Sequence, residues 1–536
     1  MTPDHPYDVA LVGYGPVGAL LAALLGAYGL RVLVLERSAA PYALPRAAHL
    51  DDEALRVLQA AGAHGPVLAA ARPLDGMDLV TGAGRLLLRL RKGGARAEPY
   101  GFPAASLVHQ PTVEAAIRTV AERHPTVEVR LGHTFEGAAQ DEGGVALDVA
   151  GPDGPYRARA AWLVGCDGAG SLVRGLMRSP LAPVPPGRPF TQTWLVVDVR
   201  RKREVALPER LLQVCSPRRP TTYVPFPGDR RRWEFMLRPG EDAAAMERPE
   251  AVRRLLAAHV DPEAVEVERA AVYTFRAVVA RYWRNGRMLI AGDAAHQMPP
   301  FLGQGLCAGV RDAHALAWRL ALVARGAAEA ALLDSYAGER RPHVEAVTRL
   351  AVRAGRVIQL GGLPARLRDR LLPPLHRLPP LRRLLAEREH DLPCAPLAFA
   401  GTPLPRRPLL PQPWVTTTDG ARVRLDDLLG AGFALIGLGL SPRAWARPSD
   451  LPLWMLLTTR AVHVVPSAEG PARGEAPWPE AGEGEVAVRD AGALSQWIGR
   501  DEVVLVVRPD RHLFGVYGPE EGARAAAALR EALGLR

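Results

Sequence analysis

Two short segments that lie far apart in the chain constrain its fold more than any other feature of its 536 residues. The first runs an apolar strand, Asp8 to Val12, into a turn with glycines at positions 13, 15 and 18. Gly13 allows a sharp turn out of the strand, Gly15 lets the backbone approach a pyrophosphate, and Gly18 lets the following helix pack closely on the sheet. The pattern therefore predicts a βαβ unit that binds a dinucleotide at the start of its helix.

The second segment places a carboxylate at the end of another apolar strand, where residues 288–292 lead directly into Asp293. An acid at this point can hold the sugar-alcohol chain that joins a flavin ring to its phosphates. A further acid, Glu36, ends the strand expected at residues 30–36 and can accept hydrogen bonds from a ribose. A nicotinamide dinucleotide has no ribityl chain, so the two segments together indicate FAD rather than NAD, and hence redox chemistry.

The α/β pattern predicts several folded units in this order along the chain. An FAD-binding Rossmann-like domain is expected in two parts, residues 1–184 and 276–360, with a substrate-binding β-sheet domain, residues 185–275, inserted between them. Residues 361–411 are dense in Pro and Arg and are expected to form a linker with short helices. Residues 412–536 alternate apolar strands with turns and predict a small separate α/β domain.

Composition excludes several classes of protein. Apolar residues make up 48% of the chain and charged residues 23%, which is typical of a folded soluble protein. The four cysteines are far apart, so we expect neither a disulfide framework nor a metal site, and a cytoplasmic location fits best. The apolar run at 9–35 is interrupted by turn glycines and predicts no membrane span. The net charge of +10 comes from scattered arginines without interleaved aromatics, so no nucleic-acid partner is expected.

Two further motifs accompany the opening pair. Residues 165–174 end a strand in Asp167-Gly168 and carry Arg174 one turn later. Taken alone, this motif favours a β-turn in which the Asp side chain caps a helix. Residues 292–307 form a glycine-rich turn that leads into a long helix, and the start of such a helix favours an anionic reduced flavin.

These motifs, in this order, resemble those of the group A flavoprotein aromatic hydroxylases. The resemblance extends over about residues 7–355 and includes Pro45-Arg46-Ala47, residues 51–56, Gln110-Pro111, Gly303-Gln304-Gly305 and Asp312-Ala313. It implies an FAD-binding domain of the glutathione-reductase and p-hydroxybenzoate-hydroxylase type. The tail is similar to the thioredoxin-like C-terminal domain of the phenol hydroxylase branch. It has no redox cysteine pair, so a structural or oligomerising role is expected, and a homodimer is one open alternative.

The resemblance also assigns residues to the site. Those that would bind FAD are Gly13, Gly15, Pro16, Gly18, Glu36, Arg37, Arg46, Gln110, Asp167, Asp293, Pro300, Gly303, Gly305, Leu306 and Cys307. Candidates to line the substrate site on the inserted sheet are Tyr223, Arg232, Phe235, Met236, Arg238 and Phe275. His296 and Tyr223 are candidate catalytic groups, although His296 is equally well read as a structural histidine.

The implied reaction is the hydroxylation of a phenolic substrate similar to hydroxyphenylpropionate. NADH or NADPH would reduce FAD, dioxygen would give a flavin hydroperoxide, and its distal oxygen would attack the ring. The chain departs from the family at Cys307 and Ala315, where Asn is common. This departure leaves open a tailoring hydroxylase or epoxidase that acts on a polyketide or quinone. A flavin-binding scaffold without turnover is a further alternative from a different class.

Overall fold

The first apolar strand lies inside a parallel sheet, as its continuous hydrophobicity predicts. The computed structural model describes residues 6–41, 45–91, 98–187, 189–377, 401–402, 404–405, 407–465, 485–490 and 492–535. The central strands of the first sheet run in the order β20, β11, β1, β2, β8, and all of these neighbours are parallel. The strands of this sheet are β1 (Tyr7–Val12), β2 (Val32–Glu36), β8 (Val127–Leu131), β9 (Thr134–Gln140), β10 (Val145–Gly151), β11 (Gly154–Gly165), β19 (Arg284–Asn285) and β20 (Met288–Ile290).

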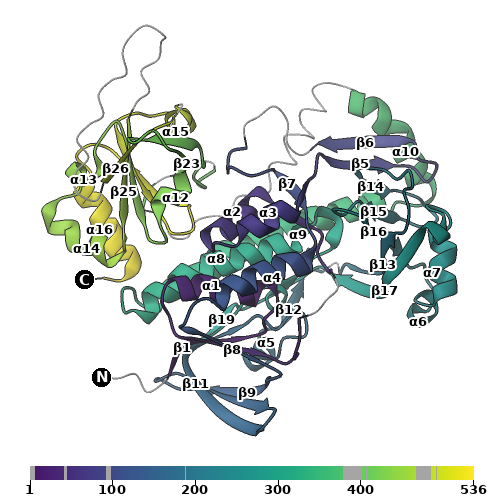
Figure 1. Cartoon of the computed structure of the whole chain (residues 1–536), viewed down its shortest axis with the longest axis horizontal. Coiled ribbons are helices and arrows are strands. Elements are labelled where there is room, and N and C mark those ends of the chain that lie inside the picture. Colours follow the sequence, from purple (N-terminus) through teal and green to yellow (C-terminus); the bar gives the residue numbers. More distant parts are fainter. Residues whose placement is uncertain are drawn as a thin grey trace.

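Helices cover this sheet and carry the chain toward the rest of the molecule (Figure 1). Helix α1 packs against both α4 and α8, and α8 packs in turn against α9. The helices of the FAD-binding part are α1 (Pro16–Ala27), α2 (Asp52–Ala60), α3 (His64–Ala70), α4 (Gln110–Ala121), α5 (Leu172–Leu176), α8 (Gln304–Ala324) and α9 (Leu332–Ile358). The strand β20 that precedes Asp293 pairs with β11 beside β1, so the two distant segments meet in one sheet.

A second sheet stands at the other side of the helices and has the order β17, β13, β16, β15, β14, β5, β6. Its strands are β5 (Gly76–Val80), β6 (Leu86–Arg91), β13 (Thr191–Arg201), β14 (Leu211–Val214), β15 (Thr221–Val224), β16 (Arg230–Met236) and β17 (Val265–Arg276). The expected range 185–275 is therefore incomplete, because the hairpin β5–β6 joins this sheet through parallel pairing of β5 with β14.

One face of the second sheet is covered by α7 (Pro249–Leu256), which follows the short α6 (Ala243–Met246). Its residues Val252 and Leu256 pack against Tyr223, Trp233 and Phe235 in a buried core. The helix α10 (Gly362–Arg377) packs on β6 and occupies the first part of the predicted linker as one long helix. Residues 378–400 of that linker, with Cys394, lie outside the described residues.

Two further sheets have three strands each. Their strands are β3 (His49–Asp51), β4 (Arg72–Pro73) and β7 (Ala105–Leu107) in one, and β12 (Leu181–Pro183), β18 (Val278–Ala280) and β21 (His296–Gln297) in the other. Cys166, Cys215 and Cys307 are free thiols. Within the described ranges, no three His, Cys, Asp or Glu side chains are grouped to hold a metal ion, and no helix has the length and apolar character to cross a membrane.

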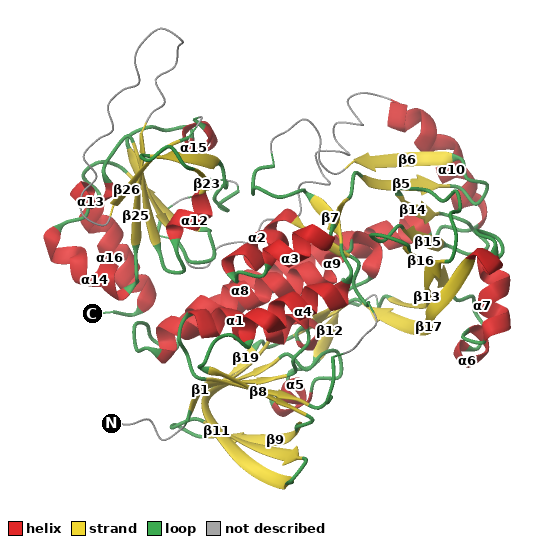
Figure 2. Ribbon diagram, viewed as in Figure 1, coloured by secondary structure: helices red, strands yellow, loops and turns green. Residues whose placement is uncertain are grey.

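The C-terminal domain has its own seven-stranded sheet in the order β23, β22, β26, β25, β24, β27, β28 (Figure 2). Its strands are β22 (Trp414–Thr417), β23 (Arg422–Arg424), β24 (Ala434–Leu438), β25 (Arg460–Val465), β26 (Glu485–Arg489), β27 (Val503–Val507) and β28 (Leu513–Tyr517). Its helices are α12 (Leu425–Leu429), α13 (Pro442–Trp445), α14 (Leu451–Leu456), α15 (Ala493–Ile498) and α16 (Gly522–Leu533).

Buried ion pairs between arginine and carboxylate side chains join the C-terminal domain to the FAD-binding domain. Arg508 donates to both carboxylate oxygens of Glu339 at 2.8 and 2.9 Å, and Arg319 donates to the same carboxylate at 2.7 Å. At a second point, Arg56 of α2 forms a bidentate pair with Asp426 at 2.7 Å. Buried ion pairs stabilise only when their geometry is good, as it is here. The domain is therefore part of one packed molecule.

Candidate functional site: a cavity between the glycine turn and the second sheet

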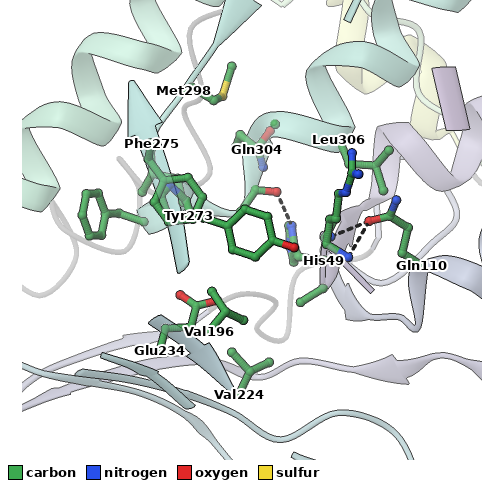
Figure 3. Close-up of a pocket in the computed structure, with 18 of the residues that line it drawn as sticks. His49, Gln110, Val196, Val224, Glu234, Tyr273, Phe275, Met298, Gln304 and Leu306 are labelled. Atoms are coloured by element: carbon green, nitrogen blue, oxygen red, sulfur yellow. Dashed lines mark hydrogen bonds between the residues drawn. The ribbon is translucent and has the colours of Figure 1, made fainter. Parts of the chain in front are cut away.

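A cavity of about 560 Å³ lies between the starts of α1 and α8 and the second sheet (Figure 3). One end is lined by Gly15, Pro16 and Asp293, and the other by strands of the second sheet. Apolar side chains make up much of the sheet end and of the segment that precedes α8, among them Val196, Val224, Phe275, Met298 and Phe301. A concave, mostly apolar site with a few polar groups is typical of small-molecule binding.

The glycine turn owes its shape to contacts that leave no room for side chains. Gly13 has φ +98, and a Cβ there would lie 2.5 Å from the carbonyl oxygen of Cys166. A Cβ on Gly18 would lie 2.0 Å from the carbonyl oxygen of Gly13. At Gly15, by contrast, a Cβ would have no atom within 4 Å and would enter the cavity. Gly13 and Gly18 therefore form the turn, while Gly15 leaves its backbone accessible.

Glu36 supports this turn from the end of β2. Its carboxylate accepts hydrogen bonds from the backbone N–H of Tyr14 at 2.8 Å and of Ser38 at 2.9 Å. The carboxylate lies beside the turn rather than among the cavity-lining residues, and Arg37 is exposed outside the cavity. The contacts that the sequence predicts from these two side chains to adenosine stay predictions.

Gln110, the first residue of α4, holds the segment that enters β3. Its Oε1 accepts hydrogen bonds from the backbone N–H of Arg46 at 3.0 Å and of Ala47 at 2.5 Å. Its amide nitrogen donates to Glu114 at 2.6 Å, which fixes the orientation of the amide group. Both Gln110 and Arg46 line the cavity, so the structure brings these two predicted residues together.

The acid at the end of the second segment also faces the cavity. Asp293 follows Gly292, whose φ of +61 turns the chain after β20. Desolvation raises the pKa of Asp293, while the charges of His296 and Arg46 act in the opposite direction. Further along, the predicted residues Pro300, Gly303, Gly305 and Leu306 line the cavity at the start of α8.

The sheet end of the cavity contains a buried cluster of charges. Asp198 on β13 accepts a hydrogen bond from Arg232 at 2.7 Å and pairs with Arg269 at 2.7 Å. Both guanidinium groups also donate to the carbonyl oxygen of Pro45, and Arg232 donates to that of Arg46 at 2.8 Å. The second sheet is thereby joined to the same segment that Gln110 holds from the other side.

Comparisons with known proteins agree with this geometry. Residues 6–351 match the family model described as an FAD binding domain, and residues 408–532 match the HcaD C-terminal domain. The chain is 36% identical over 555 residues to a 3-(3-hydroxy-phenyl)propionate/3-hydroxycinnamic acid hydroxylase of Klebsiella pneumoniae, covering 100% of this chain and 97% of that protein.

Solved structures of similar architecture extend the comparison. The anhydrotetracycline hydroxylase OxyS from Streptomyces rimosus is 28% identical, with a TM-score of 0.76 over 98% of this chain and 99% of its own. Aklavinone-11 hydroxylase, solved with FAD and aklavinone, is 25% identical, with a TM-score of 0.78 over 99% of this chain and 100% of its own.

This chain belongs to the FAD-dependent aromatic hydroxylases. The family, the fold of the FAD-binding part and the flavin cofactor that the sequence predicts are thereby confirmed, whereas the thioredoxin-like character of the C-terminal domain stays a prediction. The residues of this hydroxylase also fit FAD. Gly15 would allow the pyrophosphate close to the backbone, the start of α1 would face its charge, and Asp293, which lines the same cavity, would hold the ribityl chain.

Three predicted site residues of this hydroxylase lie behind the cavity wall. Asp167 accepts hydrogen bonds from Ser171 Oγ at 2.5 Å and from the backbone N–H of Leu172 at 2.7 Å, so its side chain caps α5, as the alternative interpretation held. Its neighbours Cys166, Gly168 and Ala169 line the cavity instead. Cys307 is fully buried, and its Sγ lies 3.9 Å from Nδ1 of His49.

His296, the third of these residues, is corrected from a candidate catalytic group to a structural one. Its ring is 1% exposed, stacks on Trp283 and places Nε2 2.6 Å from Asp312. Burial alone would raise the pKa of Asp312, but the charges of His296 and Arg340 bring it down to about 2. The histidine thus belongs to a buried ion network beneath the turn that carries Asp293.

Only some of the substrate residues predicted on the second sheet line the cavity. Arg232 and Phe275 line the cavity, whereas Tyr223 and Phe235 lie on the opposite face of the sheet, in the core under α7. Successive side chains of a strand point to opposite faces, so a shift of one position reverses the assignment. Two further predicted residues are not among those that line the cavity. Met236 packs beside the cavity in the core around Trp194, and Arg238 is exposed and pairs with Glu241.

Other residues of these strands line the cavity and were not predicted from the sequence. They include Val196, Gln213, Thr222, Val224, Glu234 and Tyr273, together with His49, Met298 and Gln304 from other elements. Strand alternation could have found some of them. Once Arg232 is placed in the cavity, Glu234 follows two positions later, and Val224 and Thr222 are the cross-strand partners of these two residues.

Proposed function

We propose that this hydroxylase is an FAD- and NAD(P)H-dependent monooxygenase that adds one oxygen atom to a phenolic ring of the hydroxyphenylpropionate kind. The observation that carries the proposal is a single cavity that extends from Gly15 and Asp293 at the cofactor end to Val196, Val224 and Phe275 at the sheet end. A ring held against the sheet would lie within reach of a flavin anchored at the glycine turn. The similarity to a relative named for 3-(3-hydroxyphenyl)propionate supports the substrate class.

Bound FAD would supply the redox chemistry, namely acceptance of hydride from NAD(P)H and activation of dioxygen. The protein's own residues would bind and orient the reactants. Apolar walls formed by Val224, Phe275 and Met298 would exclude water, which protects the oxygenating species from unproductive decay. Two groups would position the cofactor relative to the second sheet. Gln110 would act through the backbone of residues 46–47, which it holds, and Asp293 would act directly.

The test uses the full chain purified with FAD. Addition of 3-(3-hydroxyphenyl)propionate should accelerate NADH or NADPH oxidation, and mass spectrometry should find a product heavier by one oxygen atom. Flavin that is bound without any substrate-stimulated turnover would favour a scaffold instead. Failure to retain or to be reconstituted with FAD would overturn the proposal.

A second candidate is a tailoring hydroxylase or epoxidase that acts on a polycyclic polyketide or quinone. It is favoured by the full-length structural similarity to hydroxylases named for anhydrotetracycline and aklavinone. The same assay separates the two candidates when monocyclic phenols and polycyclic phenols are offered in parallel. The ring system that gives both faster cofactor oxidation and an oxygenated product identifies the substrate class.

A further inference from the structure

We propose that Glu234 recognises the substrate, and that its carboxylate accepts a hydrogen bond from a ring hydroxyl directed toward the second sheet. The proposal deepens the proposed function and rests on it, because it assigns the specificity of the same cavity. It also states which group of the substrate lies at the sheet end of the cavity. That group is a neutral phenolic hydroxyl, and a substrate carboxylate would lie elsewhere.

The position of Glu234 follows from the register of three strands. It lies on β16, with Val196 of β13 and Thr222 of β15 as its cross-strand partners. All three residues line the cavity, as alternation on one face of a sheet requires. Only 9% of Glu234 is exposed. Figure 3 shows its carboxylate directed away from the strand and toward the ring of Tyr273.

Within the part of the chain that the structure describes, no group uses the hydrogen-bonding capacity of this carboxylate. Among the described residues, none donates a hydrogen bond to it, and its one ion-pair contact is Arg232 at 3.7 Å. Arg232 directs its Nε and both terminal nitrogens to Asp198 and to the carbonyl oxygens of Pro45 and Arg46. A buried carboxylate costs free energy unless donors satisfy it, and a phenolic O–H in the cavity is such a donor.

The charges around Glu234 argue against a substrate carboxylate at this end. Arg232 and Arg269 lie beside two carboxylates, Asp198 and Glu234, so this cluster of four side chains carries no net positive charge. An added carboxylate would be repelled by Glu234, whereas a hydroxyl would be attracted to it. The other titratable or charged groups that line the cavity are Arg46, His49, Cys166, Tyr273, Arg276 and Asp293.

The ionisation of Glu234 gives the proposal a pH signature. Burial raises its pKa, with Asp198 acting in the same direction and Arg232 and Arg269 opposing. A carboxylate is the stronger acceptor when it is ionised. Binding of a phenol should therefore strengthen as the pH rises through this raised pKa, while binding of an aryl methyl ether, which cannot donate, should not.

The experiment measures binding to the oxidised FAD holoenzyme by equilibrium dialysis, without NAD(P)H. The probes are 3-(3-hydroxyphenyl)propionate with its O-methyl ether, and 2-naphthol with 2-methoxynaphthalene. Wild type should prefer each phenol over its ether by on the order of tenfold or more, which is the range of a hydrogen bond to a charged group. Glu234→Leu should abolish that preference, and Glu234→Gln should remove its pH dependence.

The control is Glu266→Gln, which makes the same change at an exposed carboxylate of β17 that pairs with Arg200 outside the cavity. It should keep both the preference and the pH profile. Retained FAD and an unchanged circular dichroism spectrum verify the fold of each variant.

Two results would overturn the assignment of Glu234 but not the proposed function. One is a wild-type preference and pH profile in both Glu234 variants, and the other is equal binding of phenol and ether by wild type. Binding of neither probe pair in the dialysis, or NAD(P)H oxidation that no substrate stimulates in the separate turnover assay, would overturn the proposed function together with its substrate class.

Discussion

The two ends of the cavity are built from different parts of the polypeptide. At the cofactor end the shape comes from backbone, since Gly13 and Gly18 leave no space for a Cβ and Gly15 opens toward the cavity. At the sheet end the shape comes from alternate side chains and from a buried charge cluster centred on Asp198. The first end should therefore be sensitive to added volume. The second should be sensitive to a change of charge or of strand face.

The largest effect is expected at the charge cluster. Asp198→Asn would leave Arg232 and Arg269 buried without their shared carboxylate, and a broken buried pair costs roughly 3–5 kcal/mol of unfolding free energy. Urea unfolding measures this loss. The matched control is Asp229→Asn, whose exposed pair with Arg201 should contribute no more than about 1 kcal/mol. Equal effects of the two changes would show that the cluster does not support the sheet end.

A smaller effect is expected from added volume at the glycine turn. Gly18→Ala would force a Cβ against the carbonyl oxygen of Gly13 and should cost about 1–3 kcal/mol of unfolding free energy. Gly15→Ala should leave stability close to wild type, because its Cβ enters open space. The same change should lower FAD affinity, measured by flavin titration of the apoprotein, since the pyrophosphate needs this approach to the backbone. Unchanged FAD affinity in Gly15→Ala would contradict the assignment of the backbone at Gly15 to pyrophosphate binding.

Neighbouring residues of β15 point to opposite faces of the second sheet, and only one of these faces lines the cavity. Thr222 lines the cavity and donates to Gln213 at 2.9 Å, so Thr222→Val should raise the KM for the phenolic substrate severalfold. Tyr223 lies in the core against Trp233, and Tyr223→Phe should leave KM unchanged. Steady-state kinetics of the two neighbouring variants gives the comparison. A larger KM effect from Tyr223 than from Thr222 would reverse the assigned face.

The smallest effect is expected at Arg238, which was predicted as a substrate residue. Its side chain is 59% exposed and pairs with Glu241, which Arg219 also holds at 2.6 Å. Arg238→Ala should therefore change the unfolding free energy by less than about 1 kcal/mol, as exposed pairs do. KM and kcat should equal those of wild type in the same assay. A raised KM would place Arg238 in the substrate path after all.

The cofactor end could be predicted from local patterns along the chain. The glycines at 13, 15 and 18 specify a local backbone shape, and steric exclusion of a Cβ acts over a few residues, so it can be read directly from the chain. The strand before Asp293 was recognisable for a similar reason, because a continuous apolar run identifies a buried parallel strand. The family and its flavin cofactor follow from these local patterns.

The sheet end, by contrast, depends on contacts between distant segments that no local pattern predicts. Alternation along β15 and β16 gives two faces, and the packing of α7 on one of them determines that Glu234 rather than Phe235 enters the cavity. The pairing of β5 with β14 and the contact between His296 and Asp312 also join segments that no local pattern connects. Which face of a strand is buried depends on the element that packs against it, and a distant part of the chain supplies that element.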